Sequence, residues 1–290
     1  MTKVSVIIPA YNHDQFIGQA IRSILDSDHS EVEILVIDDG SKDKTKSVVQ
    51  AFDMVRYFYQ ENSGAHSAIN YGLKIATGDV VAILNDDDLF HPNHLSVALC
   101  NIEEFGNDFF VGAPEIIGTG WKFDALNEHV LQSKLITEEL GYINSLFTIN
   151  WSTSTSSFVF KSELAKKLGG FHNFSMCHDL DFLLRALFFQ EAHVGTSLIP
   201  TWEYRCHETN SGSAIKLATQ HAEIIYSLGR VLDSILDIPF RKSLIKLLGY
   251  GLPVELTRTA FSEKPWSSES LQGTDSALRN WLRDCGVSLR

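Results

Sequence analysis

The sequence has few cysteines and no long apolar run, and both shortages exclude large classes of protein. Its four cysteines, in 290 residues, form no Cys-x-x-Cys pair, so neither a zinc site nor a dense disulfide framework is expected. No apolar run approaches the ~20 residues of a membrane span. The apolar run near the N-terminus is short and broken by Pro9, unlike a signal peptide. We therefore predict a cytoplasmic protein that could still touch the inner face of a membrane.

Positive charge is scarce as well. Lys and Arg number 24 against 36 Asp and Glu, which gives a net charge of -12 at pH 7. This argues against a nucleic-acid-binding protein, which normally carries a basic face. The two commonest phosphate-binding loops, GxGxxG and GxxxxGK[ST], are also missing. A phosphate-bearing substrate would therefore need a metal ion or backbone N–H groups to hold it.

The first hundred residues alternate between β-branched apolar runs and amphipathic stretches. Strands are predicted at 3–9, 31–37, 55–60 and 80–84. The first helix is predicted to begin after a cap at Asn12 or Asp14, and two more are predicted at 63–76 and at 92–105. This alternation is typical of a doubly wound α/β sheet, which binds ligands at the carboxyl ends of its strands. Farther on, strands are predicted at 109–118, 156–161 and 192–207, and helices at 134–149, at 178–190 and beyond 213.

Three adjacent carboxylates, Asp86, Asp87 and Asp88, follow the fourth predicted strand. Like charges repel, and none can be buried cheaply without a partner. Mg²⁺ and Mn²⁺ take carboxylate oxygens and leave positions open for substrate phosphates. A solvated acidic turn is an equally good reading of three aspartates alone. An EF-hand is a poor fit because its glycine and closing glutamate are missing.

Two other polar motifs also have a structural and a functional reading. Asp39, in "DDGS", follows the second strand and suits either a turn or the imide N–H of a uracil or thymine base. Asp179 opens the helix at 178–190 and suits either an N-cap or a general base held ionised by the helix N-terminus. The small residues of 63–70 either pack a helix tightly or let a nucleotide approach the backbone.

Five motifs in order resemble the family-two glycosyltransferases of the GT-A fold, over about residues 3–212. They are "VSVIIPAYNHDQFIGQAIRSIL", "EILVIDDGSKDKT", "ENSGAHSAINYGLKIATGDVVAILNDDDLFHP", "SFVFKSELAKKLGGF" and "HDLDFLLRAL". The resemblance implies a Rossmann-like, mostly parallel sheet flanked by helices. It implies a nucleotide-sugar half at 1–106 and an acceptor half at 107–212, and we predict a helical extension at 213–290.

The resemblance also implies roles for single residues. In the family, the residues matching Pro9, Ala10 and Tyr11 line the nucleotide base. The residue matching Asp39 reads the base, and the one matching Asp86 meets the ribose. We add Ser67 and Asn70, on the small-residue helix, to this nucleotide site. Asp87, with Asp88, is expected to hold Mn²⁺ or Mg²⁺, and Asp179 to act as the catalytic base. Many members have Glu where this chain has His178, which we place in the donor or acceptor pocket with Trp151 and His207.

The expected activity is inverting transfer of a sugar from a nucleotide diphosphate sugar, with UDP or dTDP favoured, to a glycan or glycolipid hydroxyl. A role in polysaccharide or glycoconjugate synthesis would follow. A non-catalytic nucleotide-sugar-binding module is the alternative. A sugar-nucleotide nucleotidyltransferase would need a Gly-rich loop with a basic residue, which "PAYNHDQ" lacks. The segment 240–252 has the pattern of an interfacial helix for a membrane or protein partner, although packing on the catalytic domain is favoured.

Overall fold

The structure is a computed structural model, and it describes residues 1–142, 146, 154–208, 210, 223–224, 226–228 and 230–231. The chain divides into two compact units, and each is described by itself. Unit 1 comprises Met1–Gly170 and Gln190–Glu208, and unit 2 comprises Phe171–Phe189 and the described part of Thr209–Arg290. The predicted boundaries at residues 106 and 212 stay predictions. Trp151 and the segment 240–252 lie outside the described residues.

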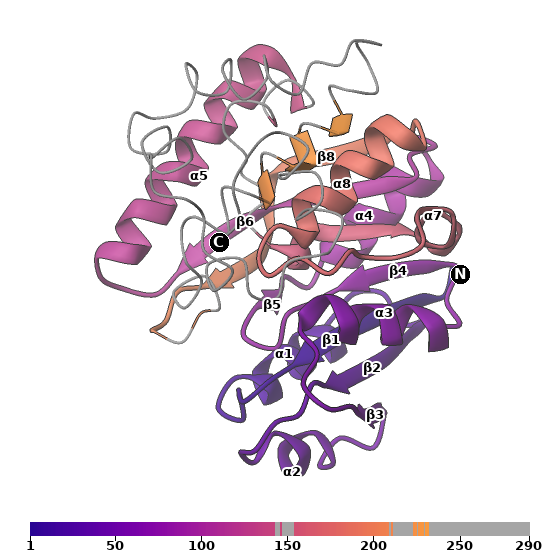
Figure 1. The fold of residues 1–290 in the computed structure, drawn as a ribbon, viewed down its shortest axis with the longest axis vertical. Helices are drawn as coiled ribbons and strands as arrows, with labels where there is room; N and C mark the ends of the chain where they lie inside the picture. The colour runs from indigo at the N-terminus through magenta and orange to yellow at the C-terminus, as the bar shows by residue number, and fades with distance from the viewer. Residues whose placement is uncertain are drawn as a thin grey trace, which may run out of the picture. The chain divides into compact units, whose positions relative to one another are not determined.

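In the part of the chain that is described, eight strands of unit 1 form one mixed sheet in the order β3-β2-β1-β4-β7-β6-β8-β5 (Figure 1). The first four strands pair in parallel, and β7 is antiparallel to both of its neighbours. β8 runs parallel to β6 and antiparallel to β5. The strands are β1 (Val4–Ala10), β2 (Val32–Asp38), β3 (Val55–Tyr59), β4 (Val80–Ile83), β5 (Leu89–Phe90), β6 (Phe109–Ile117), β7 (Phe158–Lys161) and β8 (Val194–Arg205).

Helices pack on both faces of the parallel half of this sheet. One face of β1 joins α1 and α4 in a continuous apolar core. On the other face α3 approaches so closely that a Cβ on Gly72 would lie 2.5 Å from a methyl group of Ile7. β1 is buried along its whole length, which explains why its sequence is apolar without alternation. The helices are α1 (Ile17–Leu25), α2 (Thr45–Val49), α3 (Ala65–Ile75), α4 (His94–Glu103), α5 (Trp121–Leu140), α7 (Ser162–Leu168) and, in unit 2, α8 (His178–Phe189).

Two local predictions were wrong. The helix expected at 134–149 begins at Trp121 and ends at Leu140. The first helix has no side-chain cap, because Asn12 and Asp14 accept hydrogen bonds from the backbone of Lys42 and Lys44 in the loop after β2. These two side chains therefore join two loops at the carboxyl edge of the sheet. Among the described residues, no helix combines the length and the apolar character needed to cross a membrane.

Candidate active site

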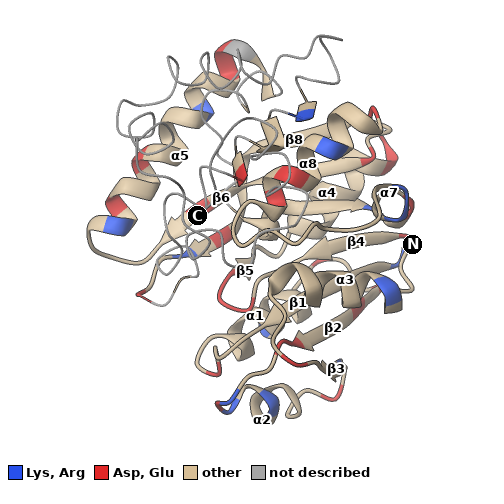
Figure 2. Cartoon of the chain, viewed as in Figure 1, with Lys and Arg blue, Asp and Glu red and all other residues tan. Residues whose placement is uncertain are grey.

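The turn between β4 and β5 carries the three aspartates (Figure 2), and each contacts a different part of unit 1. Asp86 is buried beside the end of β1, where its Oδ2 accepts a hydrogen bond from Tyr11 N at 2.9 Å. Its Oδ1 lies 2.8 Å from His13 Nδ1. Burial raises the pKa of Asp86 to about 6. Burial alone would lower the pKa of His13, but the hydrogen bond and charge of Asp86 raise it to about 8.

Asp87 lies between two histidines. Its Oδ2 is 3.0 Å from His207 Nε2, and its backbone oxygen accepts a hydrogen bond from Arg205 Nε at 3.0 Å. His13, Asp87 and His207 each offer one ligand atom, and these three atoms lie within 4.8 Å of one another. Imidazole nitrogen with carboxylate oxygen is a donor set that divalent transition metals accept.

The contact between Asp86 and His13 strengthens this interpretation. Histidines that bind metals almost always donate the other ring N–H to a carboxylate or carbonyl, which fixes the ring and its tautomer. Asp86 engages His13 through Nδ1, and this leaves Nε2 as the nitrogen suited to a metal. The residues present therefore fit a divalent ion. His207 was predicted in the donor or acceptor pocket, and His13 was not predicted at all.

Asp88 has a different environment from its two neighbours. It is 1% exposed, and its Oδ2 accepts a hydrogen bond from Ser156 Oγ at 2.6 Å. Its Oδ1 accepts one from the backbone N of Arg205 at 3.1 Å. Burial raises the pKa of Asp88 well above its usual value. Both oxygens are thus engaged by protein groups, and Asp88 is not in the group of three ligand atoms around Asp87.

A short 3-10 turn, Thr155–Ser157, holds the acidic turn in place. Asn85 donates from its side-chain amide to Ser154 Oγ at 2.8 Å and accepts from Thr155 Oγ1 at 3.0 Å. Its backbone N–H donates to Ser156 Oγ at 3.0 Å. Asn85 stands where many family members have Asp, and here it is a neutral link to this turn. The run of Ser and Thr before β7 was the sequence signal, and we missed it.

Asp39 joins the end of β2 to the start of α3. Its Oδ1 accepts from Gln60 Nε2 at 2.7 Å and from Ser63 N at 2.8 Å, and its Oδ2 accepts from Gly64 N at 2.8 Å. Gly64 has a φ of 92°, which favours glycine there. Gln60 also reaches Ser67 Oγ at 3.2 Å. Asp39 and Ser67 are therefore linked, as expected if both face one ligand.

The predicted base-lining residues lie at the end of β1. Pro9 and Ala10 are buried within the strand, whereas Tyr11 follows it and is 45% exposed. The backbone oxygen of Ala10 accepts a hydrogen bond from Asp39 N at 2.8 Å. Tyr11 is joined to Asp86 through its backbone, so its ring is free of this contact. The ends of β1, β2 and β4 are thus tied together by backbone and carboxylate contacts.

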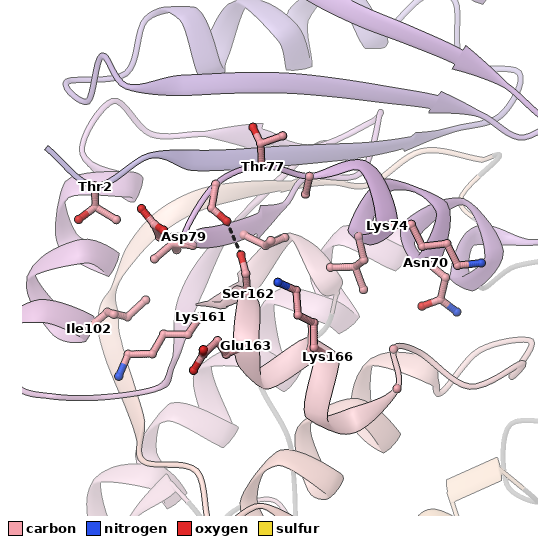
Figure 3. A pocket seen from close by; sticks show the side chains of 18 of the residues that line it. Thr2, Asn70, Lys74, Thr77, Asp79, Ile102, Lys161, Ser162, Glu163 and Lys166 are labelled. Carbon is pink, nitrogen blue, oxygen red and sulfur yellow. Dashed lines mark hydrogen bonds between the residues drawn. The ribbon is translucent and has the colours of Figure 1, made fainter.

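Asn70 lies elsewhere. It lines a hollow of about 1110 Å³ with the second half of α3, the turn before β4 and α7 (Figure 3). Lys74, Asp79 and Lys166 also line it. This hollow is at the amino end of β4, whereas the acidic turn follows the carboxyl end. The predicted role of Asn70 in nucleotide binding stays a prediction.

In unit 2, two aspartates on α8 have opposite surroundings. Burial raises the pKa of Asp179 to about 6, although its Oδ1 accepts a hydrogen bond from Leu180 N at 2.7 Å. Burial also favours the protonated form of Asp181, but His172 and Arg185 outweigh it and lower the pKa of Asp181. Arg185 Nε is 2.7 Å from Asp181 Oδ2, and His172 Nδ1 is 3.0 Å from it. Paired carboxyls with divergent pKa values are typical of acid–base sites.

His178 precedes Asp179 and is neutral in this environment, because burial lowers the pKa of His178 to about 4. Its Nδ1 is buried and has no hydrogen-bond partner among the described atoms. A buried imidazole nitrogen without a partner costs free energy, and it is suited to receive a polar group of a ligand. The predicted role of His178 in a donor or acceptor pocket stays a prediction.

Comparisons with known proteins agree with the sequence motifs. A family model described as glycosyl transferase family 2 matches residues 5–169. An uncharacterized glycosyltransferase of Rickettsia typhi is 44% identical over 93 residues, which cover 32% of this chain and 29% of the relative. A GalNAc(5)-diNAcBac-PP-undecaprenol beta-1,3-glucosyltransferase of Campylobacter jejuni is 39% identical over 118 residues, which cover 37% of this chain and 38% of that protein. The chain thus spans well under half the length of these relatives.

Solved structures share the fold. Residues 1–349 of S. aureus TarS, in complex with UDP, superpose with a TM-score of 0.64 at 20% identity, covering 89% of this chain and 73% of that one. The mannosyltransferase PcManGT from Pyrobaculum calidifontis, in complex with GDP-Man and Mn²⁺, superposes with a TM-score of 0.58 at 14% identity, covering 98% and 84%. The predicted GT-A fold, a mixed α/β sheet flanked by helices, is confirmed.

Proposed function

The chain belongs to glycosyl transferase family 2, and on that premise we propose that it transfers a sugar with inversion from a nucleotide diphosphate sugar to an acceptor hydroxyl. The observation that carries this proposal is the convergence of His13, Asp87 and His207 beside the ends of β1, β2 and β4. Ligands of α/β sheets bind at this edge. Membership of the family is shown by the family model, and the activity, the donor, the acceptor and the stereochemistry are the proposed part.

We assign the diphosphate end of the donor to the residues around Asp87. A bound divalent ion would supply positive charge to the diphosphate leaving group. Asp87 and His207, with His13, would hold that ion, and Asp86 would orient the ring of His13. Of the two predicted ions, Mn²⁺ suits this donor set better than Mg²⁺, because Mg²⁺ is bound mainly by oxygen and water. Asp88 remains a predicted ligand, but its present partners would have to release it.

We assign the nucleoside end to Asp39 and Tyr11. A carboxylate has about four acceptor positions, and Asp39 uses three for Gln60, Ser63 and Gly64. One position remains for the imide N–H of uracil or thymine. The exposed ring of Tyr11 is placed to stack on a base, and Asp86 is the predicted ribose contact. UDP or dTDP sugars are therefore the proposed donors.

We assign the proton transfer to Asp179. The acceptor hydroxyl gives its proton to the carboxylate as its oxygen bonds to the anomeric carbon. The bond from that carbon to the diphosphate oxygen breaks on the opposite face, which inverts the configuration. A carboxyl whose pKa is about 6 is a stronger base than an ordinary aspartate and is still ionised at neutral pH. The name of the Campylobacter relative, a transferase acting on an undecaprenol-linked glycan, supports a glycan or glycolipid acceptor.

Calorimetry with UDP, dTDP, GDP and CDP, each with Mn²⁺, tests the nucleoside assignment, and a screen of nucleotide sugars for metal-dependent hydrolysis tests the activity. We expect UDP or dTDP to bind most tightly and one of their sugars to be hydrolysed slowly without acceptor. Tightest binding by GDP would show that Asp39 does not select the base as proposed. Donor binding with neither hydrolysis nor transfer would favour a non-catalytic binding module.

A further inference from the structure

A buried carboxylate from the C-terminal part of the chain contacts the loop that precedes α8. Glu223 is 0% exposed, and it accepts hydrogen bonds from three consecutive backbone N–H groups. Ser175 N lies 2.7 Å from Oε1, and Met176 N and Cys177 N lie 2.9 and 3.0 Å from Oε2. All of these residues belong to unit 2. Glu223 lies beyond residues 5–169, which the family model matches.

These contacts determine where α8 begins. The backbone oxygen of Cys177 accepts the hydrogen bond of Asp181 N at 2.9 Å, so Cys177 is the residue from which the helix starts. Successive N–H groups that point at one anion form a nest, and hydrogen bonds to an ionised acceptor are roughly twice as strong as neutral ones. The carboxylate of Glu223 therefore fixes the backbone two residues before Asp179.

Stability alone is a poor reason for such a residue. Burying a carboxylate is unfavourable unless it is paired, and among the described residues no Lys or Arg forms an ion pair with Glu223. Among the described residues its partners are the three N–H groups, so it is these that offset the cost of burial. The arrangement is what a site needs when one carboxylate must be held within a fraction of an ångström.

We propose that Glu223 is a positioning residue for the general base: by holding Ser175, Met176 and Cys177 it sets the start of α8 and so the place of the Asp179 carboxylate. This inference rests on the proposed function, in which Asp179 accepts the proton of the acceptor hydroxyl. Glu223 itself touches neither the donor nor the acceptor in this scheme.

The test compares Glu223→Gln, Glu223→Asp and Ser227→Ala. Gln keeps the size of the side chain, but its NH₂ group faces an N–H donor and breaks one side of the nest. Asp keeps the charge but withdraws it by one methylene. Ser227 is the control, because it is a buried residue close in sequence to Glu223 and its hydroxyl has no hydrogen-bond partner among the described residues. Transfer kinetics, UDP–Mn²⁺ affinity and melting temperature are measured for each full-length variant.

We expect Glu223→Gln to lower kcat by roughly 10–100-fold, as misplacement of a reacting group does, with the donor KM and the UDP–Mn²⁺ affinity unchanged. Glu223→Asp should fall between Gln and wild type, and Ser227→Ala should match wild type. If Glu223→Gln does not fold, kcat and the donor KM are measured for Glu223→Asp below its melting temperature. A lower kcat with an unchanged donor KM then supports the inference. The inference is overturned if a folded Gln or Asp variant has the kcat of wild type. It is also overturned if the fall in kcat is no larger than the fraction of the variant that is unfolded.

Asp179→Asn separates this inference from the function on which it rests. Normal transfer by Asp179→Asn overturns both, because there would be no base at that position to place. An inactive Asp179→Asn beside a fully active Glu223→Gln overturns the positioning role alone and leaves the proposed base in place.

Discussion

At the scale of single residues, Asp179 and Asp181 differ in what surrounds them rather than in chemical type. Asp181 forms ion pairs with Arg185 and His172, whereas Asp179 accepts a hydrogen bond from the backbone N–H of the next residue, Leu180. The ion pairs of Asp181 give it a different task from that proposed for Asp179. A paired, buried ion holds a helix in place, and an unpaired carboxyl is available to exchange a proton.

Asp179→Asn should keep the melting temperature and the UDP–Mn²⁺ affinity but lose sugar transfer by roughly 10²–10⁴-fold, as expected for a lost general base. Asp181→Asn should lose much less transfer. It should instead unfold more easily, by about 3–5 kcal/mol, because it leaves Arg185 buried without its counter-charge. Initial rates with a competent acceptor and denaturant titrations measure the two effects. Near-normal transfer by Asp179→Asn would direct the search to Asp86, Asp88 or His178.

The pKa of Asp179, raised to about 6 by burial, gives a pH dependence with a definite sign. A base works only when it is deprotonated, so kcat should rise with pH through about pH 6 and then level off. Stability should move the other way. A carboxyl whose folded pKa exceeds its usual 3.8 stabilises the fold at low pH, and this is lost as the pH rises toward 6. A kcat that stays level from neutral pH down to about pH 5 would contradict the assignment.

At the scale of elements, Glu33 on β2 joins three segments of unit 1. Its Oε1 accepts hydrogen bonds from Ser5 Oγ on β1 and from both N and Oγ1 of Thr77 before β4, at 2.5–2.7 Å. Its Oε2 lies 3.0 Å from Arg56 Nη1 on β3. Although burial opposes it, the hydrogen bonds from Ser5 and Thr77 and the charge of Lys3 lower the pKa of Glu33 to about 2. Four strands of the parallel half thus depend on one carboxylate at the amino end of the sheet.

Glu33→Gln should lower the free energy of unfolding by about 3 kcal/mol at neutral pH, the order of magnitude that a shift from 4.5 to about 2 implies. The stabilisation is complete above the unfolded pKa of 4.5 and is lost as the pH falls toward 2. Denaturant titrations at pH 7 and at about pH 3.5 should therefore show a smaller gap between wild type and variant at the lower pH. Asp53→Asn, at an exposed position before β3, is the control. Equal gaps at both pH values would refute the linkage.

The elements that could be predicted are those with a strong local pattern. β1 to β4 were placed within about one residue because β1, β2 and β4 are rich in β-branched apolar residues and β3 is rich in aromatic ones. α5 was misplaced because its apolar residues do not form one clear face, and Leu131 and Leu135 are exposed. β5 has two residues, too few to show any period. The partners of the acidic turn, His13, Ser156 and Arg205, come from distant parts of the chain, and only folding brings them together.

At the scale of the whole molecule, a net charge of -12 opposes the approach of a nucleotide diphosphate. Such a protein binds an anion through local positive charge, and the charges of the whole molecule are screened by salt. A bound divalent ion at Asp87 would supply that local charge. The negative net charge of the chain and the ligand atoms at its acidic turn are therefore both consistent with a need for a bound divalent ion.

EDTA should abolish UDP binding by the wild-type protein, and Mn²⁺ should restore it better than Mg²⁺. Asp87→Ala should lose the metal-dependent part of binding while it keeps the fold, because Arg205 contacts the backbone oxygen of Asp87, which Ala retains. Asp53→Ala, with the same change in charge at an exposed site, should bind as wild type does. Calorimetry with and without metal measures this. Equal UDP affinity in Asp87→Ala, with or without EDTA, would remove Asp87 from the metal site.

The contacts of the acidic turn have a consequence for how the protein is made. Asp87 meets Arg205 and His207 across 118 and 120 positions of chain, and β5 beside it pairs, among the described strands, with β8. Contacts of such long range form late, because the intervening chain must be closed first. A nascent chain on the ribosome can therefore build the parallel half early. The proposed metal site is complete only after β8 has emerged, so a chain truncated before Arg205 should keep much of its sheet and have no activity.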